Sequence, residues 1–368
     1  MNLLIGYLFY YFINIKIQFL KLNMDIVINA RFLTQRITGV QRYAIEISKE
    51  LLKLNKNISV ISPKNIIQHD IAKKLNVKCI GKLKGHLWEQ ITLPIYLNKK
   101  NNPILLNFCN TAPLFYKNKI ITLHDIAFKI YPENFSFLFQ KYYNFIIPKL
   151  LLSSKQIFTV SEFSKNEILR HYNFVKDVKV IYNACNENFK PKKKTNQKKY
   201  ILAVSSITKQ KNFRSLIDAF KLIENKNINL YIVGKINKNL IDEQLPTDME
   251  KNIQFFEDIN DFELINLYSN AEALIHPSYY EGFGIPPIEA MACGCPTIVS
   301  NKSSLPEICG DASLYIDPID INDIQKKINF IINDKNAAND LIIKGFKQVN
   351  KYSWEYSATK MLKIISNI

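Results

Sequence analysis

The sequence predicts an α/β protein in which two parallel-sheet domains face a central cleft. Short apolar runs alternate with longer amphipathic stretches, as parallel sheets with crossover helices require. One charged, proline-containing stretch interrupts this alternation and divides the chain into two halves of similar pattern. With 368 residues and 47% apolar content, the chain is large enough for two hydrophobic cores. Each half has the pattern of a Rossmann-like unit, whose ligands bind at the carboxyl ends of the strands.

The first domain is predicted to span residues 24–187. Its strands are expected where short apolar runs are bounded by polar residues, at Asp25–Asn29, Ile58–Ser62, Ile104–Phe108, Ile120–Leu123 and Ile157–Val160. Helical periodicity is clearest at residues 40–54 and 162–172. Ser161 is expected to cap the second of these helices.

Residues 188–199 form the predicted linker, because they are charged, contain Pro191 and lack a core pattern. A second domain is predicted over residues 200–351. Its expected strands are Tyr200–Val204, Leu230–Val233, Ala273–His276 and Thr297–Val299. A last helix is expected within residues 352–368.

Residues 1–23 are mostly apolar, and Lys16 and Lys21 are their only charged side chains. A basic start and a small-residue cleavage site, which a signal peptide needs, are both missing. Met24 then precedes the first predicted strand. We expect this extension to result from an upstream start codon, with a marginal membrane anchor as the alternative. As an anchor, it would leave the following domain on the cytoplasmic side.

Charge composition limits the partners. Lys and Arg number 49 against 32 Asp and Glu, giving a net charge of +17, but only five of the basic residues are arginine. Because base recognition relies on arginine's bidentate fork, we expect no nucleic-acid partner. A lysine-rich surface suits attraction to an anionic membrane, and an ordinary solvated surface explains it equally well. The six cysteines form no C-x-x-C pair and indicate a reducing compartment.

A glycine-containing turn after the strand that ends at His276 carries two carboxylates. Gly282 and Gly284 let backbone N–H groups approach an anion at the start of a helix, where a diphosphate fits. Glu281 on the loop and Glu289, expected in the first helical turn, can accept hydrogen bonds from the vicinal diols of a sugar and a ribose. For an isolated pair, a charged rim and a helix-dipole glutamate would be the simpler interpretation.

The run from His276 to Pro296 resembles, nearly residue for residue, the Glu-x7-Glu signature of retaining nucleotide-sugar glycosyltransferases of family 4, or group 1. The resemblance extends from Met24 to the end of the chain. It implies the GT-B architecture, with the donor nucleotide held mostly by the second domain, the acceptor by the first, and a last helix that crosses back. It also implies that Glu281 orients the sugar and Glu289 contacts the ribose. The backbone groups that it places on the donor belong to Gly282, Phe283, Gly284 and Ile285.

Two positions in the first domain match the family's pattern. Gly39, in the run Thr38-Gly39-Val40, resembles the glycine of a loop that approaches the donor phosphates, although a tight turn would look the same in sequence. His124 follows a strand, where similar motifs place a histidine beside the donor sugar. A structural histidine is the alternative at that position.

In the second domain, Lys211 aligns with the family lysine that binds the diphosphate, where its charge would stabilise the leaving group. The sequence departs from the family at Ser205, where glycine is usual, and at Gln210, where arginine is usual. Lys209 is a candidate to compensate for the missing arginine. A solvated lysine at a helix start is the simpler reading of Lys211 alone.

The sequence contains no Asp-x-Asp pair, so we expect neither a metal nor another cofactor. By resemblance, the anomeric configuration is retained and a donor phosphate oxygen takes the proton of the attacking hydroxyl. Catalysis would then depend on Glu281, His124 and Lys211 for positioning and charge stabilisation.

The matching runs look most like bacterial mannosyltransferases and rhamnosyltransferases of surface polysaccharide assembly, in lipopolysaccharide or capsule. GDP-mannose is the leading donor, with UDP-sugars as the alternative, and the expected acceptor is a lipid-linked glycan. We expect a cytoplasmic enzyme that is peripheral on the inner face of the cell membrane.

A non-catalytic GT-B protein that binds a glycan or a partner is the competing class. A dinucleotide-dependent oxidoreductase is disfavoured, because neither half has G-x-G-x-x-G after its first strand.

Overall fold

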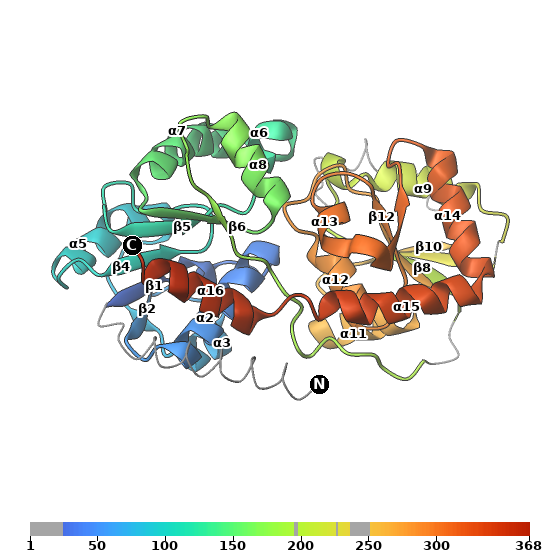
Figure 1. Cartoon of the computed structure of the whole chain (residues 1–368), viewed down its shortest axis with the longest axis horizontal. Helices are drawn as coiled ribbons and strands as arrows, with labels where there is room; N and C mark the ends of the chain where they lie inside the picture. The colour runs from blue at the N-terminus through green and yellow to red at the C-terminus, as the bar shows by residue number, and fades with distance from the viewer. Residues whose placement is uncertain (1–24, 195–197, 226, 236–250) are drawn as a thin grey trace, which may run out of the picture.

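The computed structural model describes residues 25–194, 198–225, 227–235 and 251–368. They form two α/β lobes that lie side by side (Figure 1), each built around a parallel sheet. The predicted fold class, two Rossmann-like domains with a cleft between them, is therefore confirmed. The apolar extension of residues 1–23 and part of the predicted linker lie outside the described residues.

Within the described residues the first sheet has seven strands in the order β3-β2-β1-β4-β5-β6-β7, and every pair in it is parallel. Strand order reverses between β1 and β4, which is the switch point where ligands of such sheets bind. The strands are β1 (Ile26–Asn29), β2 (Ile58–Ser62), β3 (Lys78–Cys79), β4 (Ile104–Asn107), β5 (Lys119–Thr122), β6 (Gln156–Thr159) and β7 (Lys179–Val180).

The second sheet repeats this arrangement, with six described parallel strands in the order β10-β9-β8-β11-β12-β13. Its switch point lies between β8 and β11, the strands that precede Lys211 and Glu281. The strands are β8 (Tyr200–Val204), β9 (Asn229–Val233), β10 (Ile253–Phe256), β11 (Ala273–His276), β12 (Thr297–Ser300) and β13 (Ser313–Ile316).

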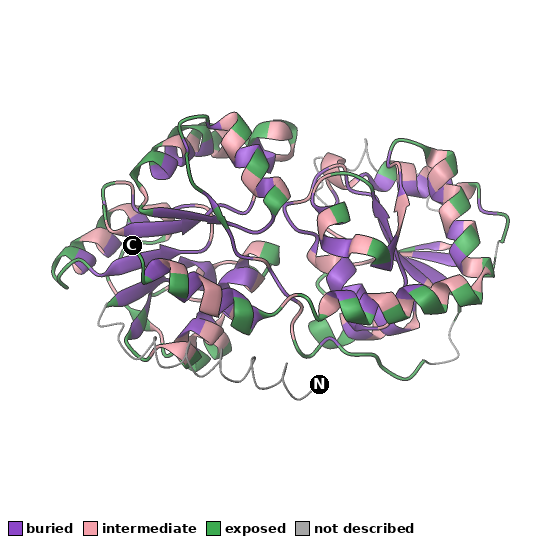
Figure 2. Cartoon of the chain, in the orientation of Figure 1, coloured by how far each residue is buried: buried purple, intermediate pink, exposed green. Residues whose placement is uncertain are grey.

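Helices cover both sheets, and the strands between them are largely buried (Figure 2). In the first domain the helical segments are η1 (Arg31–Thr34), α2 (Gly39–Leu54), α3 (His69–Lys74), α4 (Gly85–Leu87), the π-helical η2 (Trp88–Thr92), α5 (Leu93–Asn98), α6 (Ala127–Ile130), η3 (Pro132–Asn134), α7 (Phe137–Ser153) and α8 (Glu162–His171). In the second they are η4 (Lys209–Lys211), α9 (Phe213–Lys221), α11 (Asp261–Asn270), α12 (Ile285–Ala292), α13 (Leu305–Cys309), η6 (Gly310–Ala312), α14 (Ile321–Asn333) and α15 (Lys335–Val349).

The last helix, α16 (Trp354–Ile365), follows the second domain but packs on the first (Figure 1). Ala358, Met361 and Leu362 are fully buried in the same core cluster as β1 and α2. The Ser357 hydroxyl donates to the carbonyl of Tyr182 over 2.7 Å. Burial of this apolar face fixes the chain's return to the first domain.

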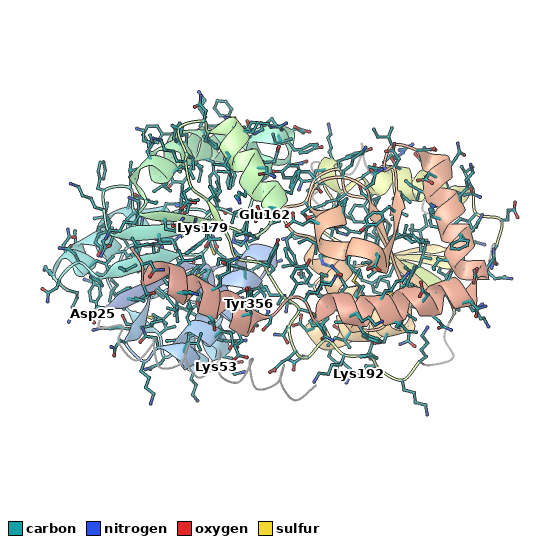
Figure 3. The ribbon with its side chains drawn as sticks, viewed as in Figure 1. Asp25, Lys53, Glu162, Lys179, Lys192 and Tyr356 are labelled. Atoms are coloured by element: carbon teal, nitrogen blue, oxygen red, sulfur yellow. The ribbon has the colours of Figure 1, made fainter. Side chains whose placement is uncertain are left out.

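The domains contact each other through polar groups at the cleft. Both carboxylate oxygens of Glu307, on α13, accept hydrogen bonds from the first N–H groups of α8, at 2.8 Å from Glu162 and 2.9 Å from Phe163. Figure 3 shows Glu162 on the side of the first lobe that faces the second. Ser161 caps α8 as expected, accepting from Ser164 N, and its hydroxyl also donates to Gly282 O over 2.6 Å. A helix of one domain is therefore capped partly by the other.

Candidate functional site

A cavity of about 490 Å³ lies between the domains, at the carboxyl ends of both sheets. The first domain contributes Thr38, Gly39 and Val40 from the start of α2, and His124 and Asp125 from the loop after β5. The second contributes the loops after β8, β9 and β11, with Ser205, Lys211, Gly234 and the run from Glu281 to Pro286. Five loops that follow strands or begin helices thus meet at one place, because parallel strands end at the same edge of a sheet.

Glu281 is the most heavily bonded group of the cavity wall. Its Oε1 accepts from Lys211 Nζ and His276 Nε2, each at 2.6 Å, and from the Ser278 hydroxyl at 2.9 Å. Its backbone N–H donates to Ser303 Oγ over 3.0 Å. Burial alone would raise the pKa of Glu281, but the charges of Lys211 and His276 outweigh it and hold the pKa well below its usual range. The carboxylate is therefore ionised and fixed in direction.

Lys211 is positioned by the residue that follows it. Asn212 adopts the left-handed conformation, with φ at 57°, and separates η4 from α9. Its side-chain amide donates to the carbonyl of Pro318 over 2.6 Å, which locks this turn against the second domain. Asparagine tolerates positive φ better than most residues, so the Lys-Asn pair suits a sharp turn that sends the lysine into the cleft.

The glycine turn brings backbone close to the other domain. At Gly282 a Cβ atom would lie 2.9 Å from the carbonyl oxygen of His124 and 3.0 Å from Asp125 Oδ2, so a side chain there would separate the domains. Gly284 has φ at 89° and is the N-cap of α12. Between them the Phe283 side chain is buried against Tyr182 and Tyr352. The Phe283 ring thus anchors the turn, and Ile285 begins the helix.

His124 is a buried, neutral imidazole. Its Nε2 lies 2.8 Å from the carbonyl oxygen of Phe108, and since a carbonyl only accepts, Nε2 carries the proton and Nδ1 is the acceptor. Burial lowers the pKa of His124 to about 4, with the Phe108 hydrogen bond opposing the shift. Tyr43 packs edge-on against the His124 ring, with the two ring centroids 4.9 Å apart. His124 can therefore orient a polar group in the cavity, but it brings no positive charge at neutral pH.

Gly39 lines the cavity opposite the glycine turn. It is the first residue of α2, and a Cβ atom there would lie 3.4 Å from Ile285 Cδ1 across the cleft. The N-terminus of α2 and that of α12 thus face the same space. Both have backbone N–H groups that a bound anion can accept from.

Two residues expected on the donor, Glu289 and Lys209, lie outside this cavity's lining. Glu289 is the fifth residue of α12 and so belongs to its second turn, one turn later than expected, because the helix begins at Ile285. Its Oε2 accepts from the Tyr268 hydroxyl at 3.2 Å, and Arg42 Nε lies 3.8 Å from its Oε1. Burial raises the pKa of Glu289, and Arg42 opposes the shift. Lys209 lies in η4 with Lys211.

Arg42 makes the contact to Glu289 from the other domain. Its guanidinium also pairs with both oxygens of Asp261, on α11, at 2.7 and 3.0 Å. An arginine of α2 thus links two carboxylates of the second domain, one on α11 and one on α12. Local sequence pattern does not predict these contacts, because the partners of Arg42 lie more than 200 residues away in the chain.

Sequence reasoning gave no role to two residues that line the cavity, Asp125 and Gly234, or to two that hydrogen-bond Glu281, His276 and Ser278. Burial raises the pKa of the Asp125 carboxyl. His276 and Ser278 hold Glu281 in place. Gly234 is also required, since a Cβ atom there would lie 1.8 Å from the carbonyl oxygen of Ser205. The signal for all four was their position at the end of a predicted strand or within two residues after it.

Comparison with known families matches both halves of the chain. Residues 37–189 match the model of Glycosyltransferase Family 4, and residues 185–348 match that of Glycosyl transferases group 1. O-antigen chain mannosyltransferase B of Escherichia coli is 28% identical, over 92% of this chain and 98% of that protein. The O-antigen chain mannosyltransferase RfbU of Salmonella typhimurium is 29% identical, over 93% and 98%.

Solved structures share the fold. Sucrose-phosphate synthase of Thermosynechococcus elongatus superposes with a TM-score of 0.73 at 17% identity, covering 93% of this chain and 98% of that one. HepE of Anabaena, solved in complex with UDP-glucose, also gives 0.73, at 15% identity, covering 94% and 100%. In the described residues no helix is both long and apolar enough to cross a membrane. The solved structures share the GT-B architecture of this chain, and the two family matches, which together span residues 37–348, show that it belongs to the family 4, group 1 glycosyltransferases.

Proposed function

We propose that this glycosyltransferase is a retaining, metal-independent enzyme that moves mannose from GDP-mannose to a hydroxyl of a lipid-linked or polysaccharide glycan. The observation that carries the proposal is the Lys211–Glu281 pair beside the glycine turn, which supplies one fixed cation and one fixed carboxylate to a single cavity. A diphosphate binds the cation and the N–H groups of the turn, while the carboxylate accepts from sugar hydroxyls.

In this mechanism the protein supplies charge stabilisation. As the bond between the anomeric carbon and the donor phosphate breaks, negative charge grows on the leaving diphosphate, and Lys211 with the α12 N-terminus offsets it. Glu281 holds the sugar, and the Nδ1 of His124 accepts from one of its hydroxyls. The proton of the attacking hydroxyl passes to a donor phosphate oxygen, so no side chain has to act as the base. Neutral His124 suits this role, because its unprotonated Nδ1 can accept from a sugar hydroxyl.

The nucleoside end of the donor is assigned to Glu289, on the basis of its place one helix turn beyond the glycine turn. In this structure Arg42 and Tyr268 occupy its neighbourhood. A ribose diol that donates hydrogen bonds to the Glu289 carboxylate would therefore also meet Arg42, which comes from the first domain. Lys209 is assigned to the outer side of the diphosphate.

Mannose is favoured because relatives that align over nearly the full length are named O-antigen mannosyltransferases. A UDP-sugar is the alternative donor, since HepE was solved with UDP-glucose. A thermal shift of the full-length protein with GDP, UDP or dTDP should separate the two donors, because at equal concentration the ligand with the higher affinity stabilises more. GDP should raise Tm in the parent and less in Glu289→Ala. No shift with any of the three would contradict the site assignment.

The reaction itself is tested by nucleotide release from GDP-mannose or UDP-glucose with and without EDTA. We expect EDTA to leave the rate unchanged. The anomeric configuration of the product, read from its one-bond C–H coupling by NMR, should match that of the donor. An inverted product, or loss of activity with EDTA that Mg²⁺ or Mn²⁺ restores, would refute the mechanism.

We further propose that the enzyme is peripheral on the cytoplasmic face of the cell membrane, with α7 as its contact. The solvent side of α7 exposes Phe137, Leu138, Phe145 and Leu152 by 58–78%. Lys149 Nζ lies 3.6 Å above the Phe145 ring, and Lys141 Nζ lies 5.0 Å from the Phe137 ring. An apolar helix face flanked by lysines is typical of a helix that lies in the surface of an anionic membrane.

A second apolar stripe supports this orientation. Leu87, Ile91 and Ile95 are exposed by 46–63% and follow one another at helical spacing along α4, η2 and α5. These helices lie beside α7, because the His86 ring is 4.6 Å from the ring of Tyr142. Two neighbouring apolar stripes on one domain form an apolar patch, and such a patch marks an interaction site, whereas a single exposed apolar residue does not.

A further inference from the structure

The two residues that carry the proposed function each follow a residue that is hydrogen-bonded to the first domain. Gln210 precedes Lys211, and Tyr280 precedes Glu281. Both hydrogen bonds fall on one stretch of the first domain, residues 126–134, which contains α6 and η3. Figure 1 shows α6 at the edge of the first lobe that faces the second.

Gln210 is bonded across the cleft. Its side-chain oxygen Oε1 accepts from Asn134 Nδ2 over 3.0 Å, at the last residue of η3. Among the described residues, the lining of the donor cavity includes Lys211 but neither Gln210 nor Asn134. The arginine that is usual at this position would bring a positive charge, and glutamine brings none. The observed contact of the Gln210 side chain is therefore with the first domain.

Tyr280 is held by the first domain as well. Its side chain is buried, and both aromatic rings that it contacts lie in that domain, Tyr131 with ring centroids 5.9 Å apart and Phe163 at 5.4 Å. Its hydroxyl accepts from the backbone N–H of Ile126 over 3.4 Å. These contacts of the Tyr280 ring thus exist only while the two domains are together.

The two loops that carry these residues are also joined to each other. The backbone N–H of Tyr279 donates to the carbonyl oxygen of Gln210 over 2.8 Å. One residue beyond Gln210 in one loop, and two beyond Tyr279 in the other, Lys211 and Glu281 form their ion pair of 2.6 Å. A displacement of residues 126–134 would therefore reach both loops, and with them the cation and the carboxylate of the cavity.

The timing of these contacts follows from the position of the cavity. A donor can enter a cavity lined by both domains only when the domains separate, so contacts across the cleft form as the domains close on the bound donor. A hydrogen bond formed at that stage contributes to turnover rather than to the initial binding of the nucleotide.

We propose that Gln210 and Tyr280 are positioning residues, which hold Lys211 and Glu281 in their catalytic arrangement through contacts with residues 126–134. The assignment rests on the proposed transferase function. It gives Gln210 a role different from that of the usual arginine, because the glutamine acts through Lys211 and not on the diphosphate.

The test is a double-mutant cycle of Asn134→Ala and Gln210→Ala in the full chain. Activity is nucleotide release from GDP-mannose or UDP-glucose, and nucleotide affinity is measured by calorimetry with GDP or UDP. Each single variant should lower kcat about fivefold, as loss of one neutral hydrogen bond predicts, and the double variant should lower it no further, because both substitutions remove the same bond. Nucleotide affinity should stay within twofold of the parent. Asn57→Ala and Gln254→Ala, at exposed positions outside the cavity lining, are the matched controls and should keep parental kcat.

Tyr280→Ala tests the second contact. It should lower kcat at least tenfold with nucleotide affinity unchanged, since an aromatic ring buried between the domains contributes more than one hydrogen bond. Hydrogen exchange of residues 126–134, measured by mass spectrometry with and without nucleotide, gives a reading that does not depend on turnover. Gln210→Ala and Tyr280→Ala, both in the second domain, should speed this exchange in the first domain, and Gln254→Ala should not.

Parental kcat in Asn134→Ala together with a loss in Gln210→Ala would overturn the proposal, because it would place Gln210 on the diphosphate. Additive losses in the double variant, or exchange of residues 126–134 that neither Gln210→Ala nor Tyr280→Ala changes, would overturn it too. If instead GDP, UDP and dTDP all fail to stabilise the parent and no nucleotide is released from either sugar donor, the proposed function itself fails.

Discussion

Lys211 and Glu281 form an ion pair of 2.6 Å between two loops of the second domain that are 70 residues apart in sequence. The lysine follows β8 and the glutamate follows β11, the strands on either side of the switch point. Both side chains are largely buried. A pair removed from water in this way interacts strongly, and an incoming diphosphate has to compete with Glu281 for the lysine.

We predict that Lys211→Ala lowers kcat about 10²- to 10³-fold, the range found when one group that stabilises a developing charge is removed. Arg214→Ala, on the exposed side of α9, is the control and should keep parental activity. Steady-state kinetics with the donor identified by thermal shift will measure both. A Lys211→Ala enzyme with kcat within threefold of the parent would remove the lysine from the proposed mechanism.

The sequence predicts well which residues surround the Lys211–Glu281 pair, because their positions depend on local sequence pattern. Lys211, His124 and Glu281 each follow a strand that is recognisable as an apolar run, and parallel strands bring their ends to one edge. Strands β10 and β13 were missed. Ser313–Ile316 begins with a small polar residue, and Ile253–Phe256 contains Gln254, so neither reads as a continuous apolar run.

Other features of the site depend on how the domains meet, which local pattern does not encode. Glu307 caps α8 from the opposite domain, and Arg42 reaches Asp261 and Glu289 across the cleft. Glu89, which accepts from Arg31 at 3.1 Å, lies in the π-helical turn η2. A single extra residue in a helical turn is not visible in hydrophobic periodicity.

The Glu307 cap predicts a variant that loosens the domains without touching the cavity. Glu307→Gln removes the carboxylate charge from the first N–H groups of α8, which should cost on the order of 1 kcal/mol of domain closure. We expect a donor KM raised about fivefold with kcat nearly unchanged, and a larger radius of gyration in small-angle scattering. Glu162→Gln changes a surface carboxylate at the same helix end and is the control. An unchanged KM and radius would show that the cap does not hold the domains together.

Buried Glu89 predicts acid sensitivity of the first domain. Its pKa falls from the ordinary value of 4.5 to about 2, despite the burial that opposes the shift, because Arg31 and His86 stabilise the ionised form. A lowered folded-state pKa contributes stability above the unfolded value, and that stability is lost as pH falls from about 4.5 to about 2. The shift corresponds to roughly 3 kcal/mol. Urea unfolding at pH 6 and pH 3 should show about 2 kcal/mol of this loss in the parent, because pH 3 is still above the folded-state pKa.

The Glu89→Gln variant should be less stable than the parent at pH 6, since it leaves Arg31 buried without its partner. Between pH 6 and pH 3 it should lose about 2 kcal/mol less than the parent does. Glu133→Gln, in the short turn η3, should keep the parental pH dependence. Parallel pH curves for the parent and Glu89→Gln would contradict the assigned ionisation. If Glu89→Gln does not fold at pH 6, the parent alone tests the prediction: its free energy of unfolding should fall between pH 6 and pH 3, and a value that does not change would contradict the assigned ionisation.

The neutral state of His124 predicts the pH dependence of catalysis. Because burial lowers its pKa to about 4, the ring stays uncharged from pH 5 to pH 9 and contributes no step to kcat/KM in that range. Its ring signals in a ¹H–¹⁵N NMR titration should move only below pH 5. A ring titrating near 6.5 would mean that the pocket is wetter than the structure indicates, and that His124 carries charge during turnover.

The exposed face of α7 makes the last prediction. Replacing Leu138 and Phe145 by serine removes two large apolar groups that water already touches in the free protein, so the fold should be unaffected. Each buried side chain of this size adds about 1.5 to 3 kcal/mol to partitioning into a lipid surface, so the double variant should bind vesicles at least tenfold more weakly. Flotation with vesicles of phosphatidylethanolamine and phosphatidylglycerol measures the bound fraction. Phe262→Ser, an equally exposed position on the second domain, should bind as the parent does.

Raising the salt to 0.5 M should weaken vesicle binding of the parent, because the attraction between the lysines beside these rings and anionic lipid is screened by salt. Equal binding of the double variant and the parent would place the membrane contact elsewhere, and binding by neither would mean that the lipid-linked acceptor is met without docking of the protein to the bilayer.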